Sequence, residues 1–495
     1  MKQVKLEIRD EVNCKIIGLD LGDRKTLMKM FEFEVPGARY LPSVRLGRWN
    51  GKTSYFALGG STYINLLPEI LPLLDQAGYD IELDDQREYS TTFNFNQVSE
   101  ETFKHKVWPA KHPMAGQPVV LRDYQIGIIN NFLANPQSIQ EVATGAGKTL
   151  TTAALSLSVE QYGRSIVIVP NKDLVRQTEA DYINLGLDVG VYFGDRKELG
   201  RTHTICTWQS LNNMMKKTQS GEAEISILDF IEGVVCVMVD EVHMAKADAL
   251  KALLTGPMSH IPIRWGLTGT IPKSKFEFMS LFVSLGNVIG KLSASELQEK
   301  GVLAQCHVNI VQLKDDVEFS NYQSELKYLT ENSERLDAIA TLVNKIKDGG
   351  NTLILVDRIG AGKELQRRLS DLFSLLKDAP DVAFVSGETN LNERKENYDE
   401  VATSTNKIII ATYGVAAVGI NIPRIFNLVL LEPGKSFVRV IQSIGRGIRK
   451  AEDKDFVQIW DITSNCKFAK RHLTQRKTYY KEANYPFDLE KLTYK

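Results

Sequence analysis

The stretch Glu141-Val-Ala-Thr-Gly-Ala-Gly-Lys-Thr149 decides the fold, because it predicts a phosphate-binding loop between a strand and a helix. We expect the strand to end near Val142 and the helix to begin near Lys148. Glycines at two positions allow a tight turn whose backbone N–H groups approach phosphate oxygens. The strict pattern has a glycine at position 142, so an ordinary glycine-rich turn is the alternative. The residues predicted to hold the phosphates are Thr144, Gly145, Ala146, Gly147, Lys148 and Thr149.

The last two residues of this loop predict specific chemistry. The ammonium of Lys148 can place a positive charge on the β- and γ-phosphates of a nucleotide. The hydroxyl of Thr149 can ligate Mg²⁺. ATP and Mg²⁺ are therefore the expected cofactors.

Composition bounds the rest of the chain. The 495 residues are 43% hydrophobic and 24% charged, with a formal net charge of −1. This length predicts about two to four domains. The charge balance excludes a globally basic nucleic-acid-binding protein, so any nucleic-acid contact must come from local patches. Five scattered cysteines and the lack of a membrane-length apolar run predict a soluble cytoplasmic protein, in the host cytoplasm if phage-encoded, with no membrane partner.

The N-terminal region has a composition of its own. Val4, Leu6 and Ile8 alternate as in an edge strand. No acidic residue occurs between Val35 and Pro68, where basic residues alternate with aromatic ones, as suits phosphate contacts and base stacking. The alternative is that the aromatic residues form a core beneath a solvated charged face. The candidate nucleic-acid contacts here are Arg45, Arg48, Trp49 and Lys52.

Two later series of strands and helices predict parallel sheets. Several strands are short apolar runs, as in strands that are buried on both faces. The first series comprises 138–142, 165–169, 189–193, 203–206, 234–239 and 264–267. The second comprises 308–313, 352–356, 382–385, 407–411, 428–431 and 456–460. A basic stretch after residue 463 predicts a terminal helix.

An acidic pair follows the apolar run 234–239. Asp240 and Glu241 would lie at the carboxyl end of a parallel strand, where open α/β sheets bind their ligands. Asp240 can hold Mg²⁺, and Glu241 can orient or deprotonate an attacking water. An acidic pair by itself more often caps a helix. Its position downstream of a phosphate loop favours the catalytic interpretation.

The ordered set of motifs resembles that of superfamily 2 helicases over residues 121–450. Leu121-Arg-Asp-Tyr-Gln125 is similar to the adenine-recognition motif of that family. The further matches are the phosphate loop, Val169–Gln177, Thr207–Leu211, Asp240–His243, Leu267–Thr270, Val385–Gly387, Ala411–Pro423 and Gln442–Arg449. The resemblance implies an α/β fold with two tandem RecA-like parallel-sheet domains and a small α+β N-terminal accessory domain.

The resemblance also implies roles for single residues. Arg122, Tyr124 and Gln125 would hold adenine, with Gly419 and Asn421 on the γ-phosphate side. Asn421 replaces an aspartate frequent in the family, which leaves its charge role in doubt. Arg446 and Arg449, one helical turn apart, would act as arginine fingers, with Gln442 one turn earlier. The implied nucleic-acid contacts are Pro170, Thr207, Gln209, Thr268, Thr270 and Thr412.

The Leu-Arg-x-Tyr-Gln and Asp-Glu-Val-His signatures favour DNA translocases over RNA helicases. The stretch 40–52 resembles the accessory domain of phage recombination helicases of the UvsW kind, which remodel branched DNA. The expected function is therefore ATP-dependent unwinding or branch migration of forks and four-way junctions in replication, recombination or repair. An RNA helicase and a non-motor ATP-switched clamp remain alternatives. A restriction-type motor is not favoured, because we find no nuclease segment of Asp…Glu-x-Lys pattern.

The domain organisation follows from these assignments. We expect an accessory domain at 1–95, a linker at 96–118, an ATP-binding RecA-like domain at 119–290, a second one at 291–462 and a basic helical tail at 463–495. DNA is the expected partner, together with possible replication or recombination proteins, and the chain is expected to be a monomer.

Overall fold

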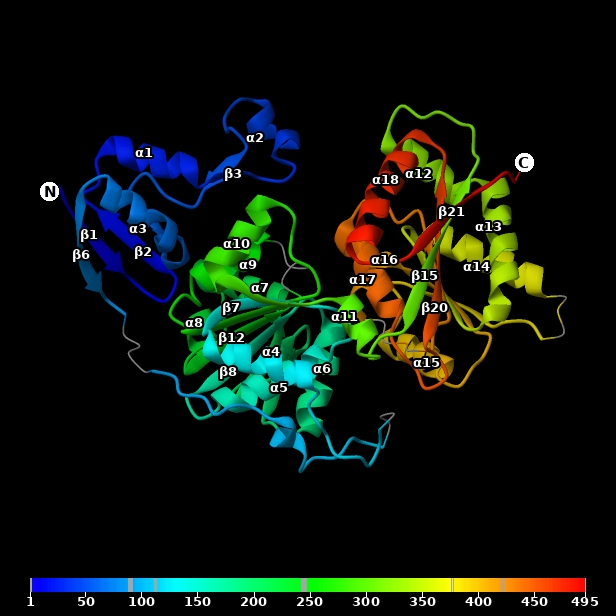
Figure 1. Cartoon of the computed structure of the whole chain (residues 1–495), viewed down its shortest axis with the longest axis horizontal. Coiled ribbons are helices and arrows are strands. Elements are labelled where there is room, and N and C mark those ends of the chain that lie inside the picture. The colour runs from blue at the N-terminus through cyan, green and yellow to red at the C-terminus, as the bar shows by residue number, and fades with distance from the viewer. Residues whose placement is uncertain are drawn as a thin grey trace. The chain divides into compact units, whose positions relative to one another are not determined.

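The computed structural model describes residues 2–87, 92–110, 114–241, 247–374, 376, 378–419, 422 and 424–494. The chain divides into two compact units (Figure 1). The first comprises Met1–Val142 and Gly147–Lys291, and the second comprises Ala143–Ala146 and Leu292–Lys495. Each unit contains a predominantly parallel sheet, as the two predicted series require.

The N-terminal part of the first unit is a small mixed sheet with its own helices. The strand order is β5-β2-β1-β6, in which β1 pairs antiparallel with β2 and parallel with β6. The alternation of Val4, Leu6 and Ile8 therefore marks a strand paired on both sides, not an edge strand. A second hairpin joins β3 to β4. The elements are β1 Lys2–Ile8, β2 Asn13–Ile17, α1 Leu21–Met30, β3 Glu32–Glu34, α2 Pro42–Arg45, β4 Lys52–Ser54, β5 Ser61–Tyr63, α3 Leu67–Gln76 and β6 Tyr79–Asp85.

This N-terminal sheet shares its hydrophobic core with a helix from much later in the chain. Phe276 and Val283 of α10 (Lys275–Leu285) are buried in the same cluster as Tyr55. The hydroxyl of Tyr55 donates to Phe276 O at 3.0 Å and lies 2.6 Å from Ser280 Oγ. Burial of this hydroxyl raises the pKa of Tyr55 well above its usual value. The accessory region is thus packed into the first unit.

The large sheet of the first unit has the order β10-β9-β11-β8-β12-β13-β7-β14 among the described residues. Its central pairs are parallel. Helices α4, α5 and α6 lie on one face, and α7, α9 and α10 on the other (Figure 1). The strands are β7 Gln137–Val142, β8 Arg164–Val169, β9 Val189–Phe193, β10 Arg196–Lys197, β11 His203–Thr207, β12 Val234–Asp240, β13 Ile263–Thr268 and β14 Asn287–Leu292. The helices before α10 are α4 Asp123–Ala134, α5 Lys148–Val159, α6 Lys172–Asn184, α7 Trp208–Ser220, α8 Ile227–Phe230 and α9 Ala247–Thr255.

The sheet of the second unit has the order β17-β18-β16-β19-β20-β15-β21, and its strand pairs are all parallel among the described residues. Helices α13 and α14 cover one face, and α17 and α18 the other (Figure 1). The strands are β15 Gln305–Leu313, β16 Thr352–Val356, β17 Val382–Val385, β18 Ile408–Thr412, β19 Asn427–Leu431, β20 Phe456–Ser464 and β21 Phe487–Leu492. The helices are α11 Ala294–Glu299, α12 Tyr322–Glu331, α13 Ser333–Ile346, α14 Ile359–Phe373, α15 Leu391–Val401, α16 Tyr413–Gly419, α17 Phe437–Gly447 and α18 Lys467–Glu482.

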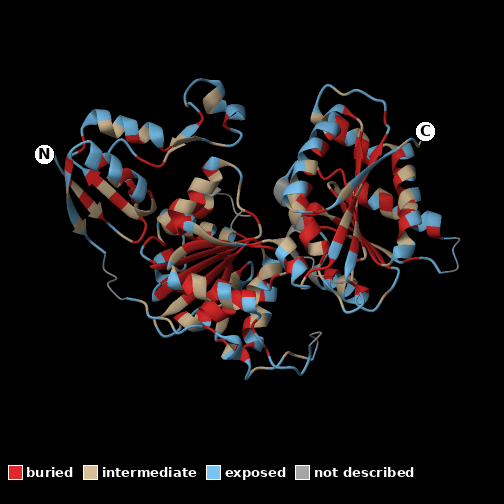
Figure 2. Cartoon of the chain, in the orientation of Figure 1, coloured by how far each residue is buried: buried red, intermediate tan, exposed pale blue. Residues whose placement is uncertain are grey.

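Burial follows the sequence pattern of each strand. All seven residues of β12 and all five of β16 are buried, as their continuous apolar runs predict (Figure 2). The basic segment after residue 463 forms α18, but the chain then returns as β21, which pairs with β15. This segment therefore contributes both a helix and an edge strand to the second unit.

Two sequence-level expectations concern the whole chain. Within the described ranges, none of the helices has the length and hydropathy needed to cross a membrane. All five cysteines are buried free thiols. Burial raises the pKa of each of them, which lowers their reactivity.

Candidate active site

The predicted phosphate loop has the backbone conformation that its glycines were expected to allow. Strand β7 ends at Val142 and α5 begins at Lys148. Gly145 and Gly147 have φ angles of +93° and +79°, in the left-handed region that favours glycine. A Cβ atom at position 147 would lie 2.5 Å from the amide nitrogen of Gln125. Only glycine therefore fits at this position without a shift.

The residues expected to hold adenine lie directly against the loop. The buried side chain of Gln125 accepts a hydrogen bond from the Arg122 backbone N–H at 2.9 Å. Its amide donates to Gly147 O at 3.4 Å. The Arg122 guanidinium donates to the Tyr124 hydroxyl at 3.0 Å. The start of α4 and the phosphate loop are therefore fixed relative to each other.

The loop lysine contacts the acidic pair. Lys148 Nζ lies 2.6 Å from Glu241 Oε1, and the two side chains are 9% and 7% exposed. The same ammonium lies 3.4 Å from Val142 O. Such a buried pair keeps both charges in a low-dielectric environment, where each strongly influences the other.

Glu241 also contacts a third motif, Leu267–Thr270. The backbone N–H of Gly269 donates to Glu241 Oε2 at 3.3 Å. The Glu241 backbone has φ +53°, an unusual conformation for a residue with a side chain, and its N–H donates to Asp240 Oδ1 at 2.9 Å. Non-glycine residues in this region carry strain, which is concentrated at functional sites. Three motifs that are distant in the sequence therefore meet at one carboxylate.

The other predicted contact residues of the first unit have clear structural partners. The Thr207 hydroxyl caps α7 by accepting from Ser210 N–H, and the amide of Gln209 donates to Pro170 O at 3.2 Å. Thr268 Oγ1 donates to Thr270 O at 2.7 Å. The side chains of Thr207, Thr268 and Thr270 are buried. The bonded hydroxyls of Thr207 and Thr268 organise the loops at the carboxyl ends of their strands, whereas the Thr270 hydroxyl has no hydrogen-bond partner among the described residues.

The second unit contains the remaining motifs. Thr412 ends β18 and Gly419 ends α16. Asn421 and His243 lie outside the described residues, as does the side chain of Gln442. Arg446 lies in the last turn of α17, which ends at Gly447.

Arg449 lies beyond the helix, which corrects the expectation of two arginines one helical turn apart. It forms an isolated antiparallel bridge with Leu303. The reason is a buried lysine. Lys454 Nζ donates to Gly447 O at 2.8 Å and to Arg449 O at 2.7 Å, and so caps the end of α17. Burial, followed by the charge of Arg449, lowers the pKa of Lys454 to about 7.

The N-terminal candidates lie on a protruding segment between β3 and β4. Arg45 and Arg48 are exposed, whereas Lys52 pairs with Glu32 at 3.6 Å. The indole N–H of Trp49 donates to Lys52 O at 2.8 Å, and the side chain is half-buried. Trp49 therefore supports the base of this segment.

The residues present fit a nucleoside triphosphate with its metal. The loop admits only glycine at position 147, a lysine ammonium stands beside it, and two buried carboxylates lie at the end of β12, which is separated from β7 by β13 in the sheet. In the described part of the chain, no group of three or more His, Cys, Asp or Glu side chains could hold a metal ion. The loop, its lysine and the two carboxylates can together orient a water molecule against a phosphoryl group.

Three contributors were missed as site residues at the sequence level. Gly269 acts through its backbone, and Lys454 has no motif to mark it. Arg439 Nη1 donates to Asp357 Oδ1 at 2.8 Å and its guanidinium lies 5.1 Å from the Tyr413 ring centroid, tying α17 to the start of α16. The sequence signal for Arg439 was a single arginine within the otherwise apolar run 437–441.

Comparisons with known proteins agree with this geometry. Residues 118–273 match the family model "Type III restriction enzyme, res subunit", and residues 334–451 match "Helicase conserved C-terminal domain". The chain is 25% identical to the ATP-dependent DNA helicase uvsW of Enterobacteria phage T4 over 472 residues, which cover 92% of this chain and 89% of that protein. It is 23% identical to the DNA 3'-5' helicase XPB of Kineococcus radiotolerans, over 74% and 64% of the two chains.

A solved structure shows the same fold. The fragment of a putative HsdR subunit of a type I restriction enzyme from Vibrio vulnificus YJ016 is 20% identical, with a TM-score of 0.57. The match covers 75% of this chain and 69% of that fragment. The two tandem RecA-like domains expected from the sequence are thereby confirmed.

Proposed function

The chain is a superfamily 2 helicase that hydrolyses ATP, and on that premise we propose that it unwinds or branch-migrates branched DNA such as forks and four-way junctions. The nucleotide site supports the ATP-dependent step. Thr149 and Asp240 would hold Mg²⁺ together with the phosphates of ATP, and Glu241 would orient the attacking water. Arg446 and Arg449 would stabilise the charge that develops on the γ-phosphate. The bound metal supplies charge neutralisation on the phosphates.

The protruding segment between β3 and β4 is the observation that carries the branched-DNA proposal. Tyr40 and Leu46 are 69% and 65% exposed, well above the other large apolar side chains of the N-terminal region apart from Leu83. Exposed apolar side chains of this kind are used by DNA-bending proteins as wedges between base steps. Arg45 and Arg48 border them on a segment without acidic residues. Apolar tips beside arginines suit a branch point, where bases are unpaired and phosphates converge.

The similarity to the phage relative supports DNA as the substrate. That relative is named an ATP-dependent DNA helicase, and the match covers 92% of this chain, which includes most of the N-terminal region as well as the two motor domains. The candidate contacts at the strand ends are hydroxyls and amides, which suit phosphates and sugars rather than base edges, so we propose movement without sequence preference.

An unwinding panel tests the proposal. Forked, four-way, tailed and blunt DNA substrates of equal length would be compared with and without ATP, with Lys148→Ala as the control that lacks the loop ammonium. We expect ATP-dependent product from forks and four-way junctions and little from blunt duplex. ATPase stimulation by RNA equal to that by DNA would favour the RNA-helicase alternative. Tight ATP-dependent binding without any unwinding would instead identify a clamp.

A further inference from the structure

Helix α18 presents a continuous basic face to solvent. Lys467, Lys470, Arg471 and Lys481 are exposed, and Lys477 is half-exposed. At about 100° per residue, these five positions fall on one side of the helix. The opposite side is buried against the sheet and consists of Ala469, His472, Leu473, Arg476 and Tyr480. We call the five outward cations the α18 basic face.

No carboxylate interrupts this face. The sequence has no acidic residue between Lys467 and Lys481. Among the described residues, none of the five cations of the α18 basic face forms an ion pair. Helix α14 of the same unit is different, because Arg367 there pairs with both Glu364 and Asp371. The charge of the α18 basic face is therefore not neutralised within the described structure.

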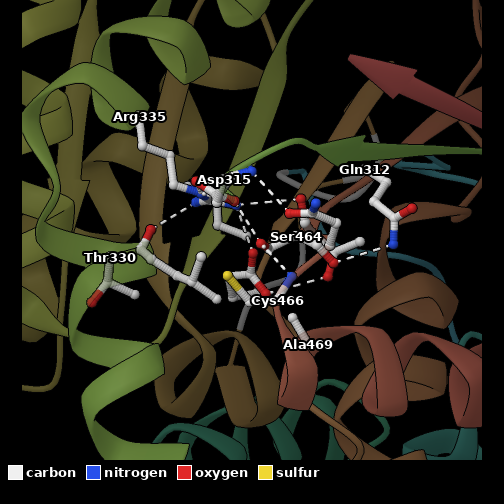
Figure 3. A network of polar contacts seen from close by, with 12 residues as sticks. Gln312, Asp315, Thr330, Arg335, Ser464, Cys466 and Ala469 are labelled. Carbon is white, nitrogen blue, oxygen red and sulfur yellow. Dashed lines mark hydrogen bonds and ion pairs between the residues drawn. The ribbon is translucent and has the colours of Figure 1, made fainter. Parts of the chain in front are cut away.

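The helix that bears this face is rigidly anchored at its N-terminus. The carboxylate of the buried Glu325 accepts hydrogen bonds from the backbone N–H groups of Phe468 at 3.0 Å and Ala469 at 2.6 Å. Immediately before the helix, the Ser464 hydroxyl donates to Asp315 at 2.5 Å, and Asp315 pairs with the buried Arg335 (Figure 3). Charge-assisted hydrogen bonds to helix N-termini are among the stronger ones in proteins. The basic face is thus held in place.

A second buried pair holds the middle of the helix. Arg476 forms a bidentate pair with Asp461 of β20 at 2.8 and 2.9 Å, and Tyr480 donates to the same carboxylate at 2.7 Å. Neither Arg476 nor Asp461 is exposed. Arg476 therefore has a structural role in holding α18 against β20, whereas the cations of the α18 basic face are solvent-accessible.

The face begins at the functional edge of the sheet. β20 and β18 are both parallel to the strands between them, so α18 starts at the edge where β18 ends at Thr412. The Tyr479 hydroxyl donates to the backbone oxygen of Lys435 at 3.0 Å, which adds a further exposed cation beside the helix. Burial, followed by the charges of Arg476, Lys435 and Arg471, lowers the pKa of His472 to about 4. This shift is an independent sign of positive potential here.

We propose that the α18 basic face binds the phosphate backbone of a duplex arm of the DNA substrate. The rise from Lys467 to Lys481 is about 21 Å, which matches roughly six base pairs of one strand. Threonines 474 and 478 stand among the cations and can donate to phosphates. The neighbouring ring of Phe468 is half-buried and packs near Tyr322, at 6.2 Å between centroids, so it does not offer a free stacking surface. The face therefore suits double-stranded backbone rather than unpaired bases.

This inference depends on the proposed function in one respect, which is that the ligand is DNA. Its test is a binding measurement without ATP, so that a failure to unwind does not affect it. Binding of a blunt duplex of about 20 base pairs would be followed by fluorescence anisotropy over a range of salt concentrations. The variant Lys470→Gln with Arg471→Gln would be compared with Lys363→Gln with Arg367→Gln, which removes the same charge from α14 of the same unit.

We expect the α18 variant to bind about tenfold more weakly at 0.1 M salt. Its slope of log K against log salt should fall by about 0.9 for each lost phosphate contact. The α14 variant should bind as wild type does. Lys470→Arg with Arg471→Lys should retain binding and its salt slope, which separates loss of charge from loss of fold, and thermal unfolding checks each variant.

Several results would overturn the proposal. Unchanged duplex affinity and salt slope in the α18 variant would do so, as would an equal loss in the α14 variant. Loss of single-strand binding without loss of duplex binding would show that the face holds unpaired DNA. Markedly tighter binding of an RNA duplex through the same residues would make RNA the occupant. If the wild-type chain bound no duplex DNA, duplex DNA would be excluded as the ligand of the α18 basic face.

Discussion

Lys148 Nζ and Glu241 Oε1 lie 2.6 Å apart, and the two charges are almost fully buried. The second oxygen of that carboxylate accepts from Gly269 N–H. A change at either end of the pair therefore acts on charge balance as well as on chemistry. Removing one partner of a buried pair leaves the other without compensation, which costs about 3–5 kcal/mol.

Lys148→Ala should abolish ATP turnover, because the phosphates lose the main point charge of the loop. It should also lower the free energy of unfolding by as much as about 3 kcal/mol, since Glu241 keeps its buried charge. Glu241→Gln should retain ATP binding and slow hydrolysis by about 10²–10⁴-fold, as expected when a general base is removed. Steady-state ATPase rates, nucleotide binding and urea unfolding measure the three effects. The double variant should recover stability without recovering activity. Wild-type ATP turnover in either single variant would contradict the assignment of these residues to the ATP site.

Arg446→Ala and Arg449→Ala should each lose most ATPase activity while DNA binding persists. An essential arginine finger contributes about 10³–10⁵ to the rate of phosphoryl transfer. The neighbouring exposed Lys450 donates to Gly301 O, its one hydrogen bond among the described residues, so Lys450→Ala is the matched control and should remain active. If either arginine variant hydrolysed ATP normally yet bound DNA poorly, that arginine would belong to the nucleic-acid surface.

Arg45→Ala combined with Arg48→Ala should weaken binding to forked DNA and reduce its salt slope by about 0.9 per lost contact. The same charge change on α1, Lys25→Ala with Lys29→Ala, is the control and should have a smaller effect. Trp49→Ala should act differently, because its indole is half-buried and bonded to Lys52 O. We expect a lower melting temperature for that variant. A stable Trp49 variant with impaired unwinding would place the indole against DNA instead.

Tyr55→Phe should lower the free energy of unfolding by about 1 kcal/mol. The hydroxyl that is lost bonds to Phe276 O and Ser280, and so joins the N-terminal sheet to α10. Tyr40→Phe changes an exposed ring and should leave stability unaltered. Urea unfolding of the two variants makes the comparison; equal stability would mean that this contact contributes nothing to the docking of the N-terminal sheet.

Stability should fall as the pH is lowered from about 6.5 to about 4 because of His472. Its pKa in the folded chain is about 4, whereas the unfolded chain takes up this proton near 6.5. Between these values the unfolded state binds more protons, so the free energy of unfolding rises with pH across the window. His472→Gln should reduce this dependence. Urea midpoints at pH 7.5 and pH 5 measure it, and an identical pH dependence in wild type and variant would refute the assignment.

The central strands could be predicted closely because their own residues determine them. The central run 352–356 was predicted with the bounds that the structure shows, and the central runs 165–169 and 234–239 each differ from the observed strand by one residue. The edge strands β14 and β21 could not be predicted, since pairing rather than apolar pattern fixes them, whereas the edge strand β17 has an apolar run of its own and was predicted with its observed bounds. β21 has the sequence Phe-Asp-Leu-Glu-Lys-Leu and is largely exposed, and β14 is only half-buried. A short polar strand of this kind has no signal apart from its neighbour.

The candidate site was predictable as a set of motifs but not as a set of contacts. The pattern identified Lys148 and Glu241 separately, whereas their direct pairing depends on the strand order of the sheet, in which β7 and β12 are separated by β13. The end of α17 shows the same limit. A helical period placed Arg449 one turn beyond Arg446, but the helix stops at Gly447, where Lys454 caps it. That lysine comes from a bend several residues later, which no local periodicity specifies.

Helix α10 follows the motif at Thr268–Thr270 and contributes to two cores, with Leu281 and Leu285 in the core of the large sheet and Phe276 and Val283 in that of the N-terminal sheet. The boundary at residue 95 is thus a boundary along the chain and not a boundary between cores. A chimaera that grafted the N-terminal segment of a relative onto this motor would leave Phe276 and Val283 facing an unfamiliar surface. The graft would have to carry its own version of residues 275–285 with it. In this chain the motor and its accessory region are therefore constrained to diverge together.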